Sequence, residues 1–170
     1  PNLLQYPVAL FGTLQAGMVV VNTNPLYTPR ELEHQLKDSG ATTIVVLENF
    51  ANTLELVLPR TQIKHVIVAS VGDMFGAIKG TLMNFVLRKI KKAVPEYRIP
   101  NAVPFQTAMK QGAALPFTKV DITREDTAFL QYTGGTTGVA KGAVLSHGNI
   151  CANMLQAKEW IRNQLREGKE

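Results

Sequence analysis

The stretch that decides the fold is TTIVVLENFANTLELVLPRTQIKHVIVAS, residues 42–70. Residues 42–48 and 65–70 are short, continuously apolar and rich in β-branched side chains, a pattern typical of strands that are buried on both faces. Residues 50–58 between them are predicted to form a short helix that ends at Pro59. A strand, a helix and a second strand in this order predict two parallel strands joined by a helical crossover.

A further helix is predicted directly before this unit, in residues 28–40. Thr28 is the predicted N-cap, and Pro29 occupies the first helical position, where a backbone N–H is not needed. Glu31 stands three residues after the cap and completes a capping box. Gly40 is the predicted end of the helix.

The alternation of helices and strands extends to the start of the chain. Residues 3–16 are predicted to form a helix that Gly17 ends, and residues 18–24 to form a short buried strand. Helices that alternate with apolar strands are the pattern of an α/β protein, so we expect a parallel sheet flanked by helices. The first residue is Pro1 rather than methionine, and we expect the chain to be an internal part of a longer protein.

The second half of the chain is less regular. Residues 95–116 contain four of the nine prolines and are predicted to be an irregular connector. Order resumes with a polar turn at residues 121–126, followed by two predicted strands at residues 128–132 and 142–147. A helix is predicted at residues 150–163, with Asn149 as its N-cap.

We expect one domain in three parts. Residues 1–72 form the half of the sheet described above, and residues 73–119 form a basic amphipathic segment and a proline-rich connector. Residues 120–170 form a strand, a loop, a strand and a helix.

The composition is that of a globular protein. The chain has 170 residues, of which 45% are hydrophobic and 18% are charged, so it can bury a sizeable core. The net charge of +5 is mild and suits an anionic metabolite or a membrane surface equally well. The aromatic residues, Trp160 included, show no stacking arrangement for RNA or single-stranded DNA, so no nucleic-acid partner is expected.

Cysteine usage and hydropathy indicate the compartment. Cys151 is the one cysteine, and no secretory signal is present, so we expect a reducing, cytoplasmic setting. We expect Cys151 to be a small buried residue of a helix. No stretch approaches the roughly 20 apolar residues that a membrane-spanning helix needs.

Residues 74–94, MFGAIKGTLMNFVLRKIKKAV, contain five basic residues and no acidic one. On a helix, the apolar face holds Ile78, Leu82, Phe85, Val86, Ile90 and Ala93, and the opposite face holds Thr81, Asn84, Arg88, Lys91 and Lys92. One hypothesis is peripheral contact with an anionic membrane, on which basic amphipathic helices lie. The other is a surface helix docked on its own domain, which is favoured because Lys79 and Lys89 interrupt the apolar face and Gly80 weakens the helix.

A loop rich in glycine and threonine lies in QYTGGTTGVAKGAVLSH, residues 131–147. Glycines let the backbone approach a ligand closely, successive backbone N–H groups can bind an anion, and threonine hydroxyls add hydrogen bonds. Lys141 adds a positive charge at the end of the loop. The pattern predicts a site for phosphate groups, and the alternative is a tight hairpin without a ligand.

Two other phosphate motifs do not fit this loop. The Walker loop requires Gly-Lys followed by Ser or Thr, but Lys141 is preceded by alanine and followed by glycine. The dinucleotide pattern G-x-G-x-x-G requires a glycine spacing that this loop lacks. A kinase of the Walker type is therefore a distant alternative.

Residues 132–142, YTGGTTGVAKG, resemble the phosphate loop of the adenylate-forming superfamily, which includes acyl-CoA synthetases, firefly luciferase and peptide-synthetase adenylation domains. The usual motif has serine in place of Gly134 and proline in place of Ala140, and both departures resemble the bacterial long-chain fatty acid–CoA ligase branch. Residues 22–41, NTNPLYTPRELEHQLKDSGA, and residues 145–149, LSHGN, are similar to that branch as well. The resemblance covers essentially the whole chain and implies part of the large N-terminal domain of a longer enzyme.

The resemblance implies two-step activation of a long-chain fatty acid. The carboxylate attacks the α-phosphate of ATP to give an acyl-adenylate and pyrophosphate, and CoA then displaces AMP to give acyl-CoA. The loop would hold the β- and γ-phosphates by positioning and charge stabilisation. The implied binding residues are Tyr132, Thr133, Gly134, Gly135, Thr136, Thr137, Gly138, Val139, Ala140, Lys141 and Gly142. His147 would line the site or would serve in capping or packing.

The resemblance also implies which parts lie elsewhere. Magnesium is expected as the companion of ATP, with its ligands outside this chain. The adenine and ribose pockets and the catalytic lysine, which belongs to a small C-terminal domain, lie further along such enzymes, so we expect residues 1–170 to be inactive alone. Two alternatives stay open: an adenylate-forming enzyme for a medium-chain, aryl or acetyl-type acid, and a non-catalytic module that binds nucleotide or membrane.

Overall fold

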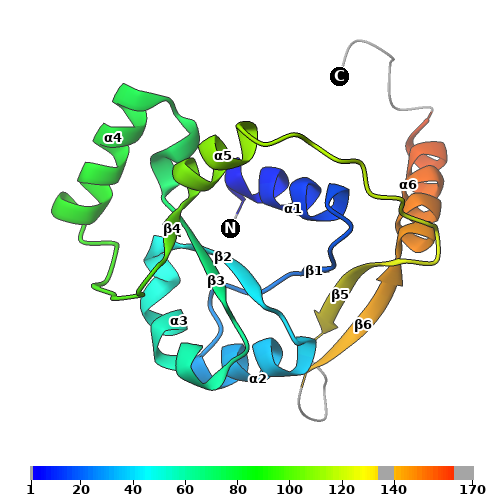
Figure 1. Cartoon of the computed structure of the whole chain (residues 1–170), viewed down its shortest axis with the longest axis horizontal. Helices are drawn as coiled ribbons and strands as arrows, with labels where there is room; N and C mark the ends of the chain where they lie inside the picture. Colours follow the sequence, from blue (N-terminus) through cyan, green and yellow to red (C-terminus); the bar gives the residue numbers. More distant parts are fainter. Residues whose placement is uncertain (1, 134–139, 163–170) are drawn as a thin grey trace. The chain divides into compact units, whose positions relative to one another are not determined.

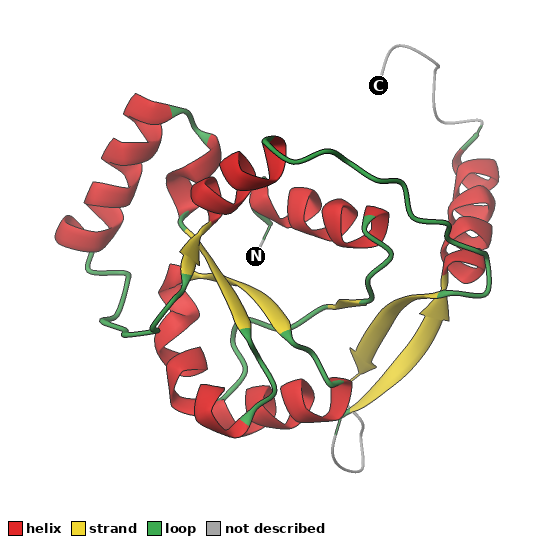
Figure 2. Cartoon of the chain, in the orientation of Figure 1, coloured by secondary structure: helices red, strands yellow, loops and turns green. Residues whose placement is uncertain are grey.

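The structure, a computed structural model, describes residues 2–133 and 140–162. Its elements in chain order are α1 (Gln5–Gln15), β1 (Val20–Val21), α2 (Pro29–Ser39), β2 (Thr43–Leu47), α3 (Ala51–Val57), β3 (His65–Ala69), α4 (Ala77–Phe85), β4 (Val103–Pro104), α5 (Phe105–Ala113), β5 (Thr127–Thr133), β6 (Lys141–Ser146) and α6 (His147–Ile161) (Figure 1, Figure 2). They form two compact units. The first unit comprises Pro1–Gly12 and Thr23–Thr118, and the second comprises Thr13–Asn22 and Lys119–Glu170.

The first unit is built on a parallel sheet with the strand order β2-β3-β4. Strand β2 pairs with β3 along its whole length, from Thr43 opposite His65 to Leu47 opposite Ala69. Helix α3 connects these two strands, with short 3₁₀ turns on either side. The predicted strand, helix and strand of residues 42–70 are therefore confirmed.

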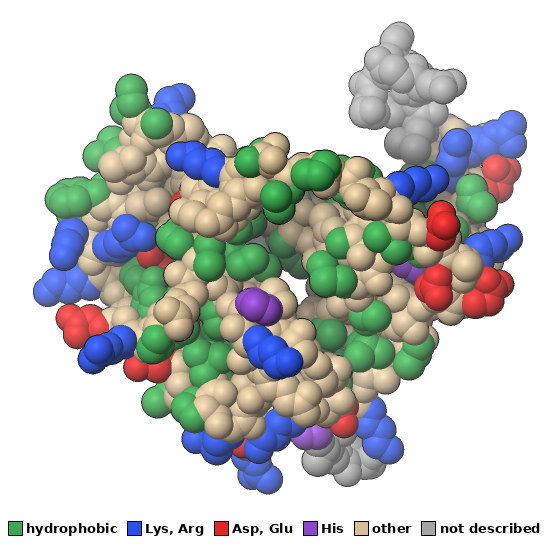
Figure 3. Space-filling view, viewed as in Figure 1, with side chains coloured by type: hydrophobic (Ala, Val, Ile, Leu, Met, Phe, Trp, Pro, Cys, Tyr) green, Lys and Arg blue, Asp and Glu red, His purple; other side chains and the backbone are tan. Residues whose placement is uncertain are grey.

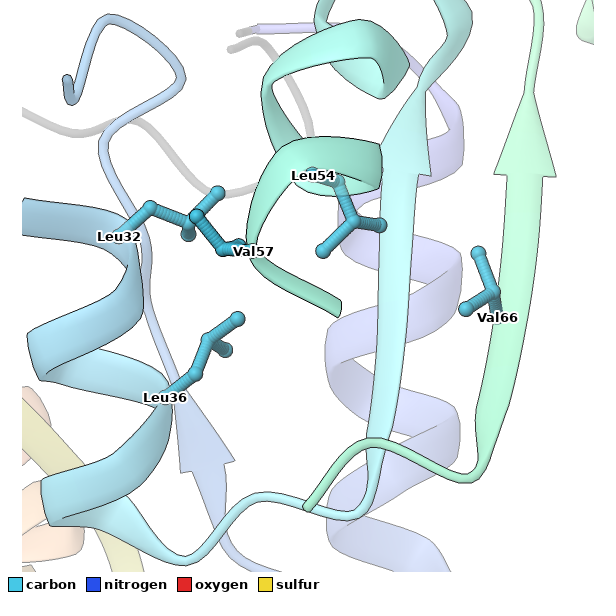
Figure 4. Packing of buried hydrophobic residues seen from close by; sticks show 5 residues of the cluster. All are labelled: Leu32, Leu36, Leu54, Val57 and Val66. Atoms are coloured by element: carbon cyan, nitrogen blue, oxygen red, sulfur yellow. The ribbon is translucent and has the colours of Figure 1, made fainter. Parts of the chain in front are cut away.

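The core of the first unit lies between this sheet and the helices α2 and α3. Leu32 and Leu36 of α2, Leu54 and Val57 of α3, and Val66 of β3 form one cluster (Figure 4). Leu54 and Val57 are completely buried. Each such side chain contributes about 1.5–3 kcal/mol when it is removed from water, so this cluster holds the crossover helix against the sheet.

The predicted boundaries of α2 are confirmed. The Thr28 hydroxyl accepts a hydrogen bond from the Glu31 backbone N–H, and the Glu31 carboxylate accepts one of 2.8 Å from the Thr28 backbone N–H. Gly40 ends the helix in the left-handed conformation, with φ of 66°. The Thr28 hydroxyl also donates a hydrogen bond of 2.7 Å to the Glu31 carboxylate. This bond, followed by that from the Thr28 backbone N–H, holds the pKa of Glu31 below its usual value.

Replacing Thr28 with alanine removes this cap and should destabilise the protein by about 1 kcal/mol at neutral pH. Because the pKa of Glu31 is lowered in the folded state, its contribution is present above the unfolded pKa and is lost as the pH falls through the folded pKa. The difference between Thr28→Ala and the wild type should therefore shrink in acid. Urea unfolding midpoints measured at neutral and acidic pH test this, and a difference that grows in acid would contradict it.

The prediction of an irregular connector over residues 95–116 is wrong for residues 103–113. They contain β4, which pairs with β3, and α5, whose Phe105 is buried. Pro104 ends β4 and is the N-cap of α5. An edge strand and a helix start both tolerate the missing N–H of proline, so proline here ends one element and begins the next rather than breaking regular structure.

The second unit contains a mixed sheet with the strand order β1-β5-β6. Strand β1 is shorter than predicted and runs parallel to β5, with Val20 opposite Phe129. Strands β5 and β6 run antiparallel, as a hairpin. The prediction of parallel strands is therefore confirmed for the sheet of the first unit and for the β1–β5 pair. Strand β6 differs, because it runs antiparallel to β5.

Helix α6 begins at His147, three residues earlier than the predicted start at Ile150. Ser146 is the N-cap, and Asn149 is the third helical residue that completes its capping box. The Asn149 side-chain oxygen accepts a hydrogen bond of 3.0 Å from the Ser146 backbone N–H. The prediction of a buried Cys151 is also wrong, because Cys151 is exposed on α6.

The basic segment at residues 74–94 is helical, as predicted, over residues 77–90. Helix α4 continues into a π-helical turn at Val86–Ile90. In the part of the chain that the structure describes, no helix combines the length and the apolar character needed to cross a membrane.

Candidate functional site

The two strands that carry the glycine–threonine loop meet at a defined point. In the β5–β6 hairpin, Thr133 is the last residue of β5, and it lies directly opposite Lys141, the first residue of β6. Side chains that are directly opposite across an antiparallel pair lie on the same face, with Cβ atoms about 4.5–5.5 Å apart. The side chains of Thr133 and Lys141 therefore leave the hairpin on the same face, next to each other, where the two strands enter the loop. Residues 134–139 lie outside the described residues.

A close contact holds the strands together one residue below this mouth. Tyr132 is buried and lies opposite Gly142. A Cβ added to Gly142 would lie 2.9 Å from Cε2 of the Tyr132 ring. Only glycine therefore leaves space for the ring across the hairpin, and this contact fixes the spacing of the two chains where they enter the loop.

The mouth of the loop is electrostatically positive. Lys141 and Thr133 are both exposed. Lys141 forms no ion pair with any residue that the structure describes. The strands β5 and β6 contain no acidic residue. An exposed ammonium that no carboxylate neutralises, next to a hydroxyl donor, attracts an anion.

Strand β1 supports β5 from its other side. The side-chain amide of Asn22 donates a hydrogen bond of 3.5 Å to the Gln131 side-chain oxygen. Gln131 directly precedes Tyr132, so the parallel β1–β5 pair supports the hairpin close to the loop. Neither Asn22 nor the β1–β5 pairing was identified as part of the site from the sequence, because the two strands are more than a hundred residues apart in the chain.

The structure does not bring His147 to the mouth of the loop. His147 is the first residue of α6 and lies six positions after Lys141 along the extended strand β6, which corresponds to about 20 Å. The His147 backbone N–H donates a hydrogen bond of 3.0 Å to the Asp126 carbonyl. His147 therefore serves in the packing of the α6 start, next to the Ser146 cap, and this position does not favour the site-lining role.

Asp126 organises the turn at this end of the hairpin. Its carboxylate accepts hydrogen bonds from the Thr123 backbone N–H, at 2.7 Å, and from the Thr123 hydroxyl, at 3.0 Å. These two bonds, with a smaller effect of His147, hold the pKa of Asp126 below its usual value. Asp126 is therefore an ionised structural residue of the turn.

Carboxylates suited to Mg²⁺ are not assembled in the described residues. No group of three or more His, Cys, Asp or Glu side chains that could hold a metal ion occurs in residues 2–133 and 140–162. The strands of the hairpin offer a hydroxyl and an ammonium, which suit a phosphate and not a cation.

The structure describes five of the eleven loop residues named from the sequence. These are Tyr132, Thr133, Ala140, Lys141 and Gly142. The remaining six, Gly134, Gly135, Thr136, Thr137, Gly138 and Val139, lie outside the described residues. The phosphate site and the hairpin, which the sequence presented as alternatives, are compatible, because the loop is carried by a hairpin.

The sequence matches the family described as AMP-binding enzyme over residues 1–169. A long-chain-fatty-acid–CoA ligase of Yersinia pestis is 58% identical over 170 residues, which are 100% of this chain and 30% of that protein. A long-chain-fatty-acid–CoA ligase of Haemophilus influenzae is 60% identical over 161 residues, which are 95% of this chain and 28% of that protein. This chain thus spans about a third or less of the length of these curated relatives.

Solved structures show the same fold. The crystal structure of a long-chain-fatty-acid–CoA ligase from Archaeoglobus fulgidus aligns with a TM-score of 0.61 and 28% identity, over 93% of this chain and 25% of that one. The arrangement of helices and sheets described above is therefore that of a part of such a protein.

Proposed function

Because this chain belongs to the AMP-binding enzyme family, we propose that the protein of which it is a part activates a long-chain fatty acid with ATP and transfers the acyl group to CoA. The observation that carries the proposal is the exposed Lys141 beside Thr133, at the mouth of a loop rich in glycine and threonine. The similarity of the whole chain to long-chain-fatty-acid–CoA ligases supports the choice of substrate.

The proposed chemistry has two balanced steps. In the first, a carboxylate oxygen of the fatty acid bonds to the α-phosphorus of ATP, and the bond from that phosphorus to the bridging oxygen breaks, which releases pyrophosphate. In the second, the CoA sulfur bonds to the acyl carbon of the adenylate, the bond from that carbon to the AMP oxygen breaks, and the thiol proton is released. Both steps move negative charge onto leaving phosphate oxygens.

In this proposal the chain binds the β- and γ-phosphates. Lys141 attracts the phosphate oxygens and stabilises the charge that grows on pyrophosphate as it leaves. Thr133 donates a hydroxyl hydrogen bond to the same oxygens, and the loop glycines bring backbone N–H groups close to them. The Tyr132–Gly142 contact keeps these donors at a fixed spacing, so that little reorganisation is needed during the reaction.

Other parts of the proposed enzyme lie outside this chain. Magnesium bound with ATP would neutralise phosphate charge, and its protein ligands are expected elsewhere in the enzyme. We propose that the enzyme works in the cytoplasm and contacts an anionic membrane peripherally through residues 74–94.

Activity of the full-length protein tests this function. Given ATP, CoA and palmitate, it should form palmitoyl-CoA and should catalyse ATP–pyrophosphate exchange that depends on palmitate. Residues 1–170 alone should do neither. Faster exchange with benzoate or acetate than with palmitate would favour the same chemistry on another acid. No exchange with any acid would favour a non-catalytic nucleotide-binding protein.

A further inference from the structure

The helix formed by α4 and the π-helical turn is attached to the first unit through its polar face. Gly80 lies against Gly72 so closely that a Cβ on Gly80 would be 2.2 Å from the Gly72 carbonyl oxygen. One turn further, the Asn84 side-chain oxygen accepts a hydrogen bond of 2.8 Å from the Gly72 backbone N–H. The docking of this helix on its own domain is thus confirmed, but the contacting face is the one opposite the apolar residues.

Arg88 continues the same row of contacts. Its guanidinium pairs with the buried Glu48 carboxylate at 2.7 Å and donates a hydrogen bond of 2.9 Å to the Ser70 hydroxyl. Glu48 and Ser70 directly follow β2 and β3, so Arg88 ties the helix to the ends of two core strands. Beyond the helix, the side-chain amide of Asn49 donates a hydrogen bond of 2.7 Å to the Ala93 carbonyl. The helix is therefore fixed along its length.

Fixing the polar face inward leaves an apolar ridge outside. We define this ridge as Ile78, Leu82, Phe85 and Ile90, whose exposed fractions are 86%, 62%, 54% and 64%. Phe75 and Met83 are exposed near it. Figure 3 shows apolar side chains and Lys or Arg side chains together over α4. A docked surface helix normally buries its apolar face against its own domain, so this arrangement is reversed.

The charged side chains within residues 74–94 are all of one sign. Lys79 and Lys89 are the sequence neighbours of Ile78 and Ile90, and Lys91 and Lys92 follow the ridge directly. All four lysines are exposed, and none forms an ion pair with a described residue. Residues 74–94 contain no acidic side chain. A surface that is apolar along its centre and cationic beside it complements an anionic lipid layer.

We propose that the apolar ridge inserts into an anionic lipid surface while Lys79, Lys89, Lys91 and Lys92 bind its phosphate headgroups. This inference rests on the peripheral membrane contact proposed above and assigns the residues that make it. Because Gly80, Asn84 and Arg88 hold the helix to the core, the contact needs no detachment of the helix. Arg88 belongs to this internal attachment and does not bind lipid.

Co-sedimentation of the full-length protein with vesicles tests this surface. The vesicles are pure phosphatidylcholine, or phosphatidylcholine with about one third phosphatidylglycerol. Reversing three charges, in Lys89→Glu with Lys91→Glu and Lys92→Glu, should lower the partition coefficient on anionic vesicles at least about a hundredfold. The matched control reverses three exposed lysines elsewhere, Lys64, Lys110 and Lys119, and should change it far less.

A second pair of variants tests the ridge itself. Changing Ile78→Gln with Leu82→Gln should lower the partition coefficient at least about tenfold, whereas Leu26→Gln with Leu115→Gln, at two other exposed leucines, should not. Raising NaCl from about 0.05 M to about 0.5 M should release the wild type from anionic vesicles, a measurement that needs no variant.

Three outcomes would overturn the proposal. The first is a wild type that does not bind anionic vesicles, and the second is a lysine variant that binds them as the wild type does. The third is a ridge variant that binds them unchanged, which would mean that another part of the polypeptide covers Ile78 and Leu82. Palmitate activation measured without vesicles separates this proposal from the enzymatic one. Loss of vesicle binding with activity retained supports the surface, and absence of activity in the wild type rejects only the enzymatic proposal.

Discussion

Replacing Lys141 with alanine in the full-length enzyme should slow palmitate-dependent ATP–pyrophosphate exchange by roughly ten- to a hundredfold. A hydrogen bond to a charged group contributes about 1.5–3 kcal/mol, and each 1.4 kcal/mol is a factor of ten in rate. Lys141 is the exposed cation at the loop mouth, opposite Thr133. Since pyrophosphate carries more concentrated charge as it leaves than ATP does when bound, the loss should fall on kcat as well as on the KM for ATP.

Two matched variants separate the site from a general effect of charge. Lys141→Arg keeps the positive charge and should retain part of the exchange rate, although the guanidinium has a different shape. Lys110→Ala removes an exposed lysine from α5 and should leave the rate unchanged. If Lys141→Ala exchanges as fast as the wild type, Lys141 does not bind the leaving phosphates.

Replacing Gly80 with alanine should lower the free energy of unfolding by at least about 2 kcal/mol. The added Cβ would lie 2.2 Å from a backbone oxygen, which no rotamer change can relieve, so α4 must move away from Gly72. Movement of α4 would also strain the pair between Arg88 and the buried Glu48. Separating a buried charge from its partner costs about 3–5 kcal/mol, so the loss of stability would reach this size if the pair between Arg88 and Glu48 were broken.

Gly112→Ala is the control for Gly80→Ala. Gly112 lies in α5 of the same unit, and a Cβ there would meet no atom within 4 Å. Alanine in a helix is favoured over glycine by up to about 1 kcal/mol, so this variant should be as stable as the wild type or slightly more stable. Urea unfolding of the full-length protein compares the two variants, and faster hydrogen exchange in α4 should accompany Gly80→Ala. Equal stability of both variants would mean that the Gly72–Gly80 contact is not required.

Much of the fold could be predicted because its signals are local. The boundaries of α2 depend on hydrogen bonds between Thr28 and Glu31 and on a left-handed Gly40, all within the helix or next to it. The parallel pair of β2 and β3 follows from two apolar runs and the helix between them. The assignment of phosphate binding to the loop rests on an equally local signal, the combination of glycine, threonine and lysine, and it stays a prediction.

The errors occurred where a local signal had two possible meanings. Pro104 suggested irregular chain, but it ends an edge strand and begins α5. Asn149 suggested a cap, but Ser146 occupies that position and Asn149 completes the box. Proline does favour places where a regular element ends, and asparagine does favour the start of a helix. Which element Pro104 ends, and which position Asn149 takes at the start of α6, depend on the residues beside them in the structure.

The direction in which α4 faces could not be predicted. Its sequence defines one apolar face and one polar face, and either face is able to pack on the protein. The outcome depends on Gly72, Glu48 and Ser70, which precede the helix in the chain and reach it only in the fold. A buried carboxylate that needs a partner holds Arg88 inward, and the apolar ridge is consequently exposed.

The phosphate loop shows the same division. Its residues, its charge and its family resemblance are properties of eleven consecutive positions and are visible without coordinates. That Thr133 stands opposite Lys141, that Tyr132 packs on Gly142 and that His147 lies at the far end of the hairpin follow from strand pairing. Hydrogen bonds and spacing within a few residues are encoded locally, whereas the pairing of distant segments depends on which buried groups satisfy one another once the whole chain has folded.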